Sequence, residues 1–350
     1  MKEFKRILYN IKRFIWLCAV FIVRIVLAPK KFKVPILKGL YYNFFGGFTS
    51  NQVALYNLNK KNKKEYLSEF DWYKSRKINY PNSYKLNNKL LCNKIIKEYV
   101  NIPTTHITKE NGIYKNKEDK KINLNEVIAI LKKEKSLFFK PISIGKGRGI
   151  FRLDYENNKF KIDFKTVSEN KLKEILEEKD NYFISSRIKQ SKYLDKIYDK
   201  TSNTIRIITA RDNSDNINIL AAVQRIGTKN TIPVDNGSKG GLIANIDLES
   251  GTLSSAKSLN NKNTYKYHPD SNNIIEGVTI PNWKLLKKEI TKSAKKLTDF
   301  KFIAWDILPT DTDFYVIEAN NSSGVNIIQV FGGQRNKKLG NYYRDQRIIK

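Results

Sequence analysis

The sequence predicts an α+β protein in which helices and strands mix without strict alternation. The chain has 350 residues, of which 40% are hydrophobic and 12% aromatic, so it can bury a sizeable core in one large or two medium domains. Apolar residues that recur every three or four positions indicate helices, whereas short apolar and aromatic runs between polar turns indicate strands. Segments of both kinds follow one another irregularly, which favours layers of helix and sheet.

The chain is strongly basic, with 65 Lys and Arg against 34 Asp and Glu, a formal charge of +31 and a pI near 9.8. This balance suggests an acidic partner: a nucleotide, an anionic membrane or a nucleic acid. The lysines are scattered rather than interleaved with aromatics in one patch, so much of the charge reflects composition and we expect no nucleic-acid partner. Cys18 and Cys92 lack metal-ligand spacing, and His106 and His268 are too few and too far apart for a zinc site or a His-based triad.

Residues 1–33 are predicted to contain a basic amphipathic helix over 4–27. Its apolar stripe comprises Phe4, Ile7, Leu8, Ile11, Phe14, Ile15, Cys18, Phe21, Ile22 and Ile25, and its basic side comprises Lys5, Arg6, Lys12, Arg13 and Arg24. The uninterrupted apolar run 14–23 is far shorter than the roughly 20 residues that span a bilayer. We therefore expect peripheral attachment to the anionic inner face of the cell membrane from the cytoplasm, with Lys30, Lys31 and Lys33 adding attraction. The alternative is a helix packed on the protein's own body.

The remaining elements are expected in the following order. Region 34–84 reads as helical segments and loops, with the aromatic stretch 40–48 as a loop that also touches the membrane. Helices are predicted at 87–100, 124–135, 169–178 and 282–297, and strands at 102–107, 137–141, 159–164, 182–186, 204–209 and 219–226.

Near the C-terminus, two apolar strand-like runs, Trp305-Asp306 and 314–320, flank the turn sequence Pro309-Thr-Asp-Thr-Asp313. If the hairpin folds about residue 312, Asp306 lies opposite Glu318, and Asn320 shares the face of Glu318. Two carboxylates and an amide then converge, which is a donor set for Mg²⁺ with positions left for phosphate oxygens. The alternative is a solvated hairpin whose acids face water.

A second motif, Lys140-Pro-Ile-Ser-Ile-Gly-Lys-Gly-Arg-Gly-Ile150, places glycines at 145, 147 and 149. Alternate glycines let a turn approach an anion with its N–H groups exposed, and Lys140, Lys146 and Arg148 add positive charge. The spacing fits neither a Walker loop nor a dinucleotide fingerprint. Alone, this stretch reads as a flexible tight turn; together with the acidic hairpin it predicts both halves of a nucleotide site.

These motifs, in this order, resemble the ATP-grasp superfamily over about residues 85–345. The resemblance is carried by Asn88-Lys89, Ile102-Pro103-Thr104, Lys140-Pro141 with the glycine loop, Ile188-Lys-Gln190 and Asp306 with Glu318-x-Asn320. The stretches 202–209, 224–227, 234–236, 240–241, 246–251, 268–269 and 280–281 resemble the sugar-transfer-associated ATP-grasp group, whose members are linked to exopolysaccharide and capsule gene sets. The resemblance implies two α+β lobes that grip ATP, with residues 85–186 forming the N-terminal part and 187–350 the C-terminal lobe.

The resemblance also implies roles for individual residues. Asp306, Glu318 and Asn320 would hold Mg²⁺, Lys140 would contact the α- and β-phosphates, and Gly145 to Gly149 would cover the β- and γ-phosphates. The expected nucleotide contacts are Lys140, Ser143, Gly145, Lys146, Gly147, Arg148, Gly149, Ser185, Ser186 and Ile188. The family usually has a Glu near the position of Ser186, but residues 184–190 contain no acid, so ribose or adenine contact would fall to backbone groups or to Ser185 and Ser186.

Arg206 and Arg225 lie inside apolar strands, where an unpaired guanidinium is costly. They could form structural ion pairs with Asp235 or Asp247, or they could stabilise the γ-phosphate and a developing acyl-phosphate. The resemblance favours the catalytic role, with Asn203, Asp235 and Asn236 orienting the acceptor or the arginines. His268-Pro269 is expected to shape a loop.

The leading hypothesis is an ATP- and Mg²⁺-dependent carboxylate–amine ligase that forms an acyl-phosphate and then an amide. The resemblance implies a sugar or glycan-lipid acceptor and an amine as its further substrates, within cell-surface polysaccharide or capsule synthesis. The alternatives are a kinase of the same fold that phosphorylates a sugar or lipid hydroxyl, and a non-catalytic basic scaffold that binds membrane or nucleic acid.

Overall fold

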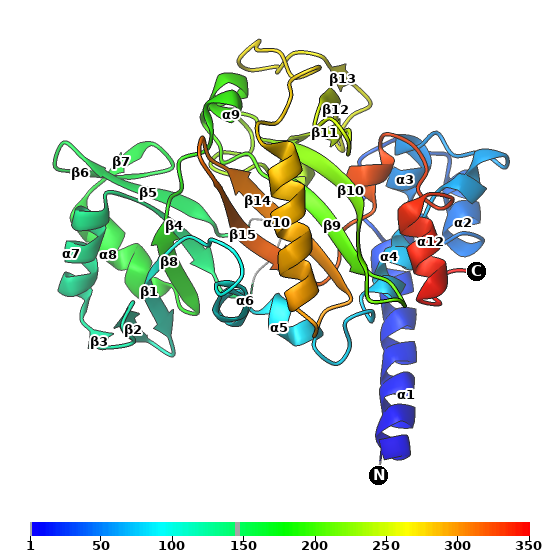
Figure 1. Cartoon of the computed structure of the whole chain (residues 1–350), viewed down its shortest axis with the longest axis horizontal. Helices are drawn as coiled ribbons and strands as arrows, with labels where there is room; N and C mark the ends of the chain where they lie inside the picture. Colours follow the sequence, from blue (N-terminus) through cyan, green and yellow to red (C-terminus); the bar gives the residue numbers. More distant parts are fainter. Residues whose placement is uncertain (1, 144–147) are drawn as a thin grey trace.

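The computed structural model describes residues 2–143 and 148–350, which fold around two antiparallel sheets (Figure 1). The first sheet has the strand order β3-β2-β1-β8-β4-β5-β6-β7. Its strands are β1 (Thr105–Glu110), β2 (Ile113–Asn116), β3 (Lys121–Ile122), β4 (Ser136–Pro141), β5 (Phe151–Glu156), β6 (Lys159–Ile162), β7 (Lys165–Val167) and β8 (Tyr182–Ser186). Helices α7 (Leu124–Glu134) and α8 (Glu169–Glu178) pack their apolar sides on this sheet.

The second sheet has the order β13-β12-β11-β10-β9-β14-β15. Its strands are β9 (Ile205–Arg211), β10 (Ile217–Ile226), β11 (Leu242–Ile246), β12 (Leu253–Ser258), β13 (Thr264–Tyr265), β14 (Phe302–Pro309) and β15 (Phe314–Asn320). Helix α10 (Trp283–Lys296) packs on one face, whereas α11 (Asn326–Gln329) and α12 (Lys338–Asp345) pack on the other (Figure 1). The short α9 (Lys192–Ile197) and the 3₁₀ turn η3 (Gly237–Lys239) lie in the connections.

The N-terminal region is helical. It comprises α1 (Lys2–Val20), η1 (Phe21–Val26), α2 (Ile36–Phe44), α3 (Ser50–Leu55), η2 (Asn62–Glu65), α4 (Glu69–Ser75), α5 (Ser83–Asn87) and α6 (Lys89–Ile96). Helix α1 projects away from the rest of the molecule, with the N-terminus at its far end (Figure 1). Among the described residues, none of the helices is at once long and apolar enough to cross a bilayer.

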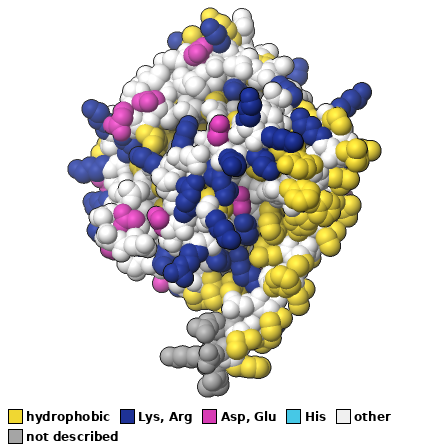
Figure 2. All heavy atoms as spheres, turned by 90° about the vertical axis from the view of Figure 1, so that its right-hand side faces the viewer, with side chains coloured by type: hydrophobic (Ala, Val, Ile, Leu, Met, Phe, Trp, Pro, Cys, Tyr) yellow, Lys and Arg dark blue, Asp and Glu magenta, His cyan; other side chains and the backbone are white. Residues whose placement is uncertain are grey.

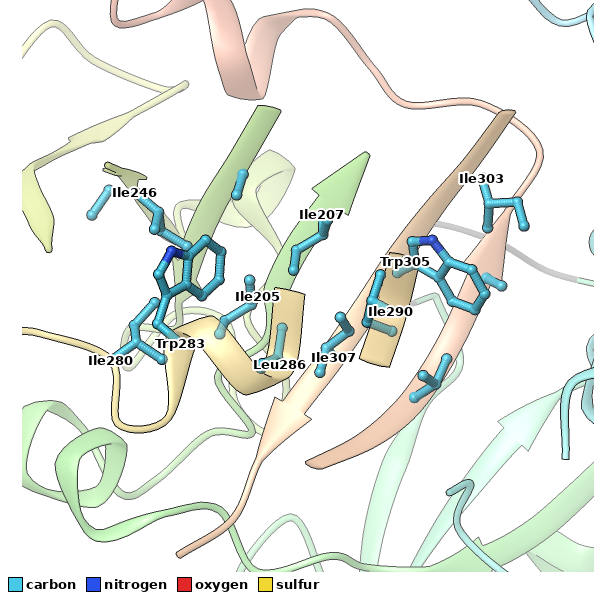
Figure 3. Close-up of a cluster of buried hydrophobic side chains, with 14 of the residues drawn as sticks. Ile205, Ile207, Ile246, Ile280, Trp283, Leu286, Ile290, Ile303, Trp305 and Ile307 are labelled. Carbon is cyan, nitrogen blue, oxygen red and sulfur yellow. The ribbon is translucent and has the colours of Figure 1, made fainter. Parts of the chain in front are cut away.

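The core between the second sheet and α10 fixes which way the hairpin side chains point (Figure 3). Ile303, Trp305 and Ile307 face α10, and the Trp305 indole N–H donates to the Thr209 hydroxyl at 2.8 Å. Because side chains alternate along a strand, Asp306 points to the opposite face of the sheet. Burial of the large apolar residues of β14 therefore holds this carboxylate in a defined direction.

Most predicted elements are confirmed, and α8 and β8 have the expected ends. Three expectations need correction. The strand expected at 102–107 begins only at Thr105 and runs on to Glu110. The stretch 40–48 is not a loop, because α2 continues to Phe44 before Gly47, at φ +70°, turns the chain. The helix expected at 87–100 is shorter, since it begins after the Asn88 cap, whose side chain accepts from the Leu91 N–H, and ends at Ile96.

Candidate active site

A cavity of about 340 Å³ lies between the two sheets and is lined by residues that are far apart in the sequence. Lys140 from β4 and Ser186 from β8 line it on the side of the first sheet. Asp306, Glu318 and Asn320 line it on the side of the second sheet, as do both predicted arginines. The structure therefore brings the acidic hairpin and the strand before the glycine loop to one cavity, as the sequence predicted.

The glycine loop itself is described only in part. Gly145, Lys146 and Gly147 lie outside the described residues. Ser143, Arg148 and Gly149 are exposed, and Gly149 adopts φ +70°, in the region that favours glycine. Ile150, which follows the loop, lines the cavity, so the loop begins and ends beside the acids of the hairpin.

The β14–β15 register is the one expected from the sequence. Asp306 pairs directly with Glu318, and a β-bulge follows between Asp306 and Ile307. Asn320 lies beside Asp306, with its Nδ2 at 3.4 Å from Asp306 Oδ2. The three expected metal ligands therefore share one face of the hairpin.

Arg206 and Arg225 hold the Asp306 carboxylate. Arg206 donates through Nε to Oδ1 at 2.6 Å and through NH2 to Oδ2 at 2.9 Å, and Arg225 NH1 donates to Oδ1 at 3.0 Å. The other arm of Arg225 meets Asp235 at 2.6 Å. The partner of Arg206 is thus Asp306, whereas Asp247, the alternative considered from the sequence, accepts hydrogen bonds from Ser250 in an exposed turn.

This cluster perturbs the acids in opposite directions. Burial alone would raise the pKa of Asp306, but the charges and hydrogen bonds of Arg206 and Arg225 outweigh it and lower that pKa. Burial raises the pKa of Asp235, and the opposing effects of Arg225 and Thr204 offset it only in part. Asp306 is therefore the firmly ionised member, held in place by two cations.

Asp306, Glu318 and Asn320 can hold a hard divalent cation if the Asp306 carboxylate binds the two arginines and the cation at the same time. A carboxylate offers about four acceptor positions, and the two arginines occupy three of those on Asp306. Rotation of the Asn320 amide would turn its oxygen toward the cavity and free the remaining position. Glu318 lies 3.6 Å from the Lys89 ammonium. The described part of the chain holds no cluster of three or more His, Cys, Asp and Glu, so a cation here would need further oxygens from phosphate or water, as Mg²⁺ commonly takes them.

Lys140 is the buried cation of the first sheet. Burial lowers the pKa of its ammonium to about 8, although the negative charge of Glu318 acts in the opposite sense. The ammonium lies 5.7 Å from the ring centre of Phe138 and 5.9 Å from that of Phe183. An anion beside Lys140 would stabilise its charged form, which is the behaviour expected of a phosphate-binding lysine.

Part of the described cavity lining is apolar. It includes Pro103, Phe138, Ile150, Ile188, Leu308 and Ile317. The backbone N–H of Ile188 has no hydrogen-bond partner among the described residues. Ser186 lines the cavity, but Ser185 is absent from its described lining, and the Ser185 hydroxyl is buried without a described partner. Ser186 pairs with Leu137 in the sheet, and its hydroxyl lies 2.7 Å from His106 Nε2. Both serine contacts with a nucleoside stay predictions.

The described lining also includes Asp235, Asn236 and Ser238, together with Trp72 of α4. The Asn236 side chain accepts from the Ser238 N–H and so fixes the turn η3. Trp72 comes from the N-terminal helical region, and no local pattern in the sequence connects it with the site.

Two other expected residues support the site from a distance. Asn203 is fully buried, and its side chain accepts from the Gly227 N–H at 2.8 Å and donates to the Tyr198 carbonyl at 2.7 Å. It holds the start of β9 in place and does not belong to the described lining of the cavity. Its expected role in orienting the acceptor or the arginines stays a prediction. His268 shapes a loop, as expected, through hydrogen bonds to Gly227 and to Asp270.

Comparison with known proteins places these features in context. The profile of the family described as sugar-transfer associated ATP-grasp matches residues 71–340. A search for curated relatives found none that matches. Similar solved structures include the L-amino acid ligase from Bacillus licheniformis (13% identity, TM-score 0.38, covering 74% of this chain and 48% of that chain). A second is the N5-carboxyaminoimidazole ribonucleotide synthetase from Thermotoga maritima (9% identity, TM-score 0.37, covering 68% of this chain and 42% of that chain). A third is the ATP-grasp ligase PsnB with a minimal precursor, Mg and ADP (11% identity, TM-score 0.34, covering 70% of this chain and 53% of that chain).

The chain spans about half the length of these solved structures. The family match is more extensive, since it takes in both sheets, the acidic hairpin and every described residue that lines the cavity. The chain therefore belongs to the sugar-transfer associated ATP-grasp family.

Proposed function

We propose that the protein is an ATP- and Mg²⁺-dependent ligase that joins a carboxylate to an amine. The observation that carries this proposal is the cavity in which Lys140, two arginines and the set Asp306, Glu318 and Asn320 face one another. The charged side chains of its described lining are three cations (Lys140, Arg206, Arg225) and three anions (Asp235, Asp306, Glu318). This equal number of positive and negative side chains suits a polyphosphate that binds as a complex with a divalent cation.

Asp306, Glu318 and Asn320 would hold Mg²⁺, which would neutralise phosphate charge when bound. Lys140 binds oxygens of the α- and β-phosphates, and the apolar part of the lining takes the nucleoside. A carboxylate oxygen of the substrate attacks the γ-phosphorus, the bond to the β–γ bridging oxygen breaks, and ADP leaves. An amine nitrogen then attacks the acyl carbon, phosphate departs, and the nitrogen gives up a proton to form the amide.

Arg206 and Arg225 stabilise the oxyanions of these steps. Both arginines line the cavity together with Asp306, whose carboxylate fixes their orientation. A preorganised donor costs no reorientation when charge develops, and a planar fork matches two phosphoryl oxygens. Asp306 thus has two roles, as a ligand of the cation and as the anchor of both arginines.

We propose a sugar or lipid-linked glycan of cell-surface polysaccharide as the acceptor, on the strength of the family description. The experiment that tests the reaction mixes the protein, MgATP and panels of amino acids and uronic-acid sugars, and measures ADP and inorganic phosphate. A ligase releases phosphate into solution. A kinase of the same fold would leave the phosphate on the acceptor, and a non-catalytic scaffold would show no nucleotide-dependent thermal shift.

We further propose attachment to an anionic membrane through a surface formed by α1, η1 and α2, here called the apolar face. Figure 2 shows hydrophobic side chains along this side of the molecule, with Lys and Arg beside them. The exposed apolar residues are Phe4, Ile7, Leu8, Ile11, Phe14, Ile15, Trp16, Ile22, Val23, Leu27, Ile36, Leu37, Leu40, Tyr41, Phe44 and Phe45. Exposed Lys30 and Lys33 in the linker supply the attraction to acidic headgroups.

The other side of the same helix packs on the protein, so the packing alternative considered from the sequence also holds in part. Val20 and Ile25 are buried against Tyr73 of α4, which places Ile25 off the exposed stripe to which it was assigned. Arg13 donates to the Lys74 carbonyl at 2.8 Å. This packing fixes the apolar face relative to the cavity, because Trp72 of α4 packs on the same cluster.

Vesicle sedimentation tests the apolar face. Leu37 is 83% exposed on α2 and Leu285 is 55% exposed on α10, on a different part of the molecule. We expect Leu37→Ser to weaken binding to vesicles containing phosphatidylglycerol about tenfold, because it removes one inserted aliphatic side chain. Leu285→Ser should bind like the wild type. Equal binding by both variants, or equal binding to purely zwitterionic vesicles, would contradict the assignment.

A further inference from the structure

We infer that Lys31 is a positioning residue through which attachment to an anionic membrane strengthens nucleotide binding in the cavity. The inference rests on the proposed ATP binding and the proposed membrane attachment. Residues 27–35 form the linker between η1 and α2, two elements of the apolar face. From this linker the Lys31 ammonium donates to the Ser238 carbonyl at 3.0 Å, and it also donates to the side-chain oxygen of Asn260.

Helix α3 holds the backbone of the linker at Lys31. The side-chain oxygen of Asn51 on α3 accepts from the Lys31 backbone N–H at 2.7 Å, and its amide donates to the Pro29 carbonyl at 2.8 Å. The neighbouring Gln52 donates to the Asn326 side chain of α11 at 2.8 Å, so α3 is itself tied to the helices of the second sheet. The Lys31 side chain therefore reaches the turn η3 from a defined position.

The turn η3 connects this contact with the cavity. The Asn236 side chain accepts from the Ser238 N–H at 2.9 Å and from the Ser238 hydroxyl at 2.8 Å, so the carbonyl that the linker contacts belongs to a hydrogen-bonded turn. Asp235, Asn236 and Ser238 all line the cavity. Asp235 meets Arg225 at 2.6 Å, and Arg225 donates to Asp306 at 3.0 Å. Fixing η3 therefore also fixes residues beside the arginines and an expected metal ligand.

Membrane attachment makes the Lys31 contact easier to form. Because η1 and α2 insert on either side of the linker, attachment restricts the linker at both ends, and a loop that is ordered in advance loses less entropy when it makes a contact. Acidic headgroups also offset the repulsion that the exposed Lys30 and Lys33 exert on the Lys31 ammonium. Both effects favour the state in which Lys31 holds η3.

The coupling between the two binding events is reciprocal. If the membrane strengthens ATP binding by some factor, ATP strengthens membrane binding by the same factor. The contact is a hydrogen bond at the surface, where the net contribution is small, so we expect a factor of about three. Vesicles should lower the dissociation constant of MgATP by this factor, and MgATP should lower the lipid concentration needed for half-maximal vesicle binding equally.

Calorimetry tests the inference by measuring the dissociation constant of MgATP with and without saturating vesicles that contain phosphatidylglycerol. The wild type should show the gain in affinity, and so should Lys31→Arg, which keeps a charged donor. Lys31→Met should bind the vesicles and show no gain. Lys33→Met is the matched control, because it removes the same charge from an exposed position of the same linker, and its gain at saturation should equal that of the wild type.

Vesicle sedimentation with and without MgATP measures the coupling in the other direction. The wild type should sediment at a lower lipid concentration when MgATP is present, whereas Lys31→Met should not respond to it. An equal gain in Lys31→Met and wild type would overturn the inference, and so would the absence of any gain in a wild type that binds both ATP and vesicles. Failure of the wild type to bind ATP, or to bind vesicles, would instead remove the proposed function or the proposed attachment, and the inference with it.

Discussion

At one end of the cavity, charged side chains from three neighbouring strands, Arg225, Arg206 and Asp306, hold one another in place. Elsewhere the described lining is apolar, with Pro103, Phe138, Ile150, Ile188, Leu308 and Ile317. The charged arrangement cannot lose one member without leaving another charge unpaired, whereas an apolar lining residue can be shortened without unpairing a charge. Substitutions in the charged cluster should therefore affect folding and chemistry together, and conservative substitutions in the apolar lining should affect mainly affinity and selectivity.

The largest effect is the loss of folding stability expected for Asp306→Asn. Loss of this carboxylate leaves Arg206 without its ionic partner and Arg225 with Asp235 alone. Breaking a buried ion pair from one side costs on the order of 3–5 kcal/mol in the free energy of unfolding. Urea denaturation measures this quantity. Glu174→Gln, which removes an exposed acid paired with Lys171 on α8, is the control and should cost about 1 kcal/mol or less. Similar losses in the two variants would mean that the arginine cluster is not a structural unit.

An effect of intermediate size is expected on the affinity for MgATP when Lys140 loses its proton. Because the pKa of this ammonium is about 8 in the free protein and an adjacent phosphate would raise it, ATP binding should take up a proton above pH 8. The affinity for MgATP should then fall by up to about tenfold per pH unit between pH 8 and 9.5. Lys140→Gln should bind more weakly at pH 7 and lack this component of the pH dependence. Parallel pH profiles for wild type and variant would place the phosphates away from Lys140.

The contrast between these two regions also explains what could be predicted from the sequence. The acidic hairpin is local, because the turn pairs Pro309 with Phe314 and the bulge between Asp306 and Ile307 then sets Asp306 opposite Glu318. Burial of Trp305 then decides the direction in which the Asp306 carboxylate points, and the apolar strand pattern predicts that this tryptophan is buried. The elements α8 and β8 could be predicted equally well, since an N-cap serine and a short apolar run are short-range signals.

Contacts between elements that are distant in the sequence could not be predicted. His106 Nε2 lies 2.7 Å from the Ser186 hydroxyl beside a bulge between Thr105 and Ile107, and single-sequence patterns do not encode a bulge. Trp72 reaches the cavity because α4 packs beside the second sheet, a placement that depends on tertiary packing. The aromatic stretch 40–48 was wrongly taken for a loop because its two glycines dominate the local composition, whereas the preceding apolar spacing forms α2.

The claim that a metal–nucleotide complex occupies the cavity is tested most directly by calorimetric titration of ATP with and without Mg²⁺ in wild type and Glu318→Gln. The account predicts that Mg²⁺ strengthens ATP binding by wild type at least about tenfold, and that Glu318→Gln loses most of this gain while it retains its melting temperature. If a folded Glu318→Gln gained as much affinity from Mg²⁺ as the wild type does, the hairpin would not be the metal site and the account would be wrong.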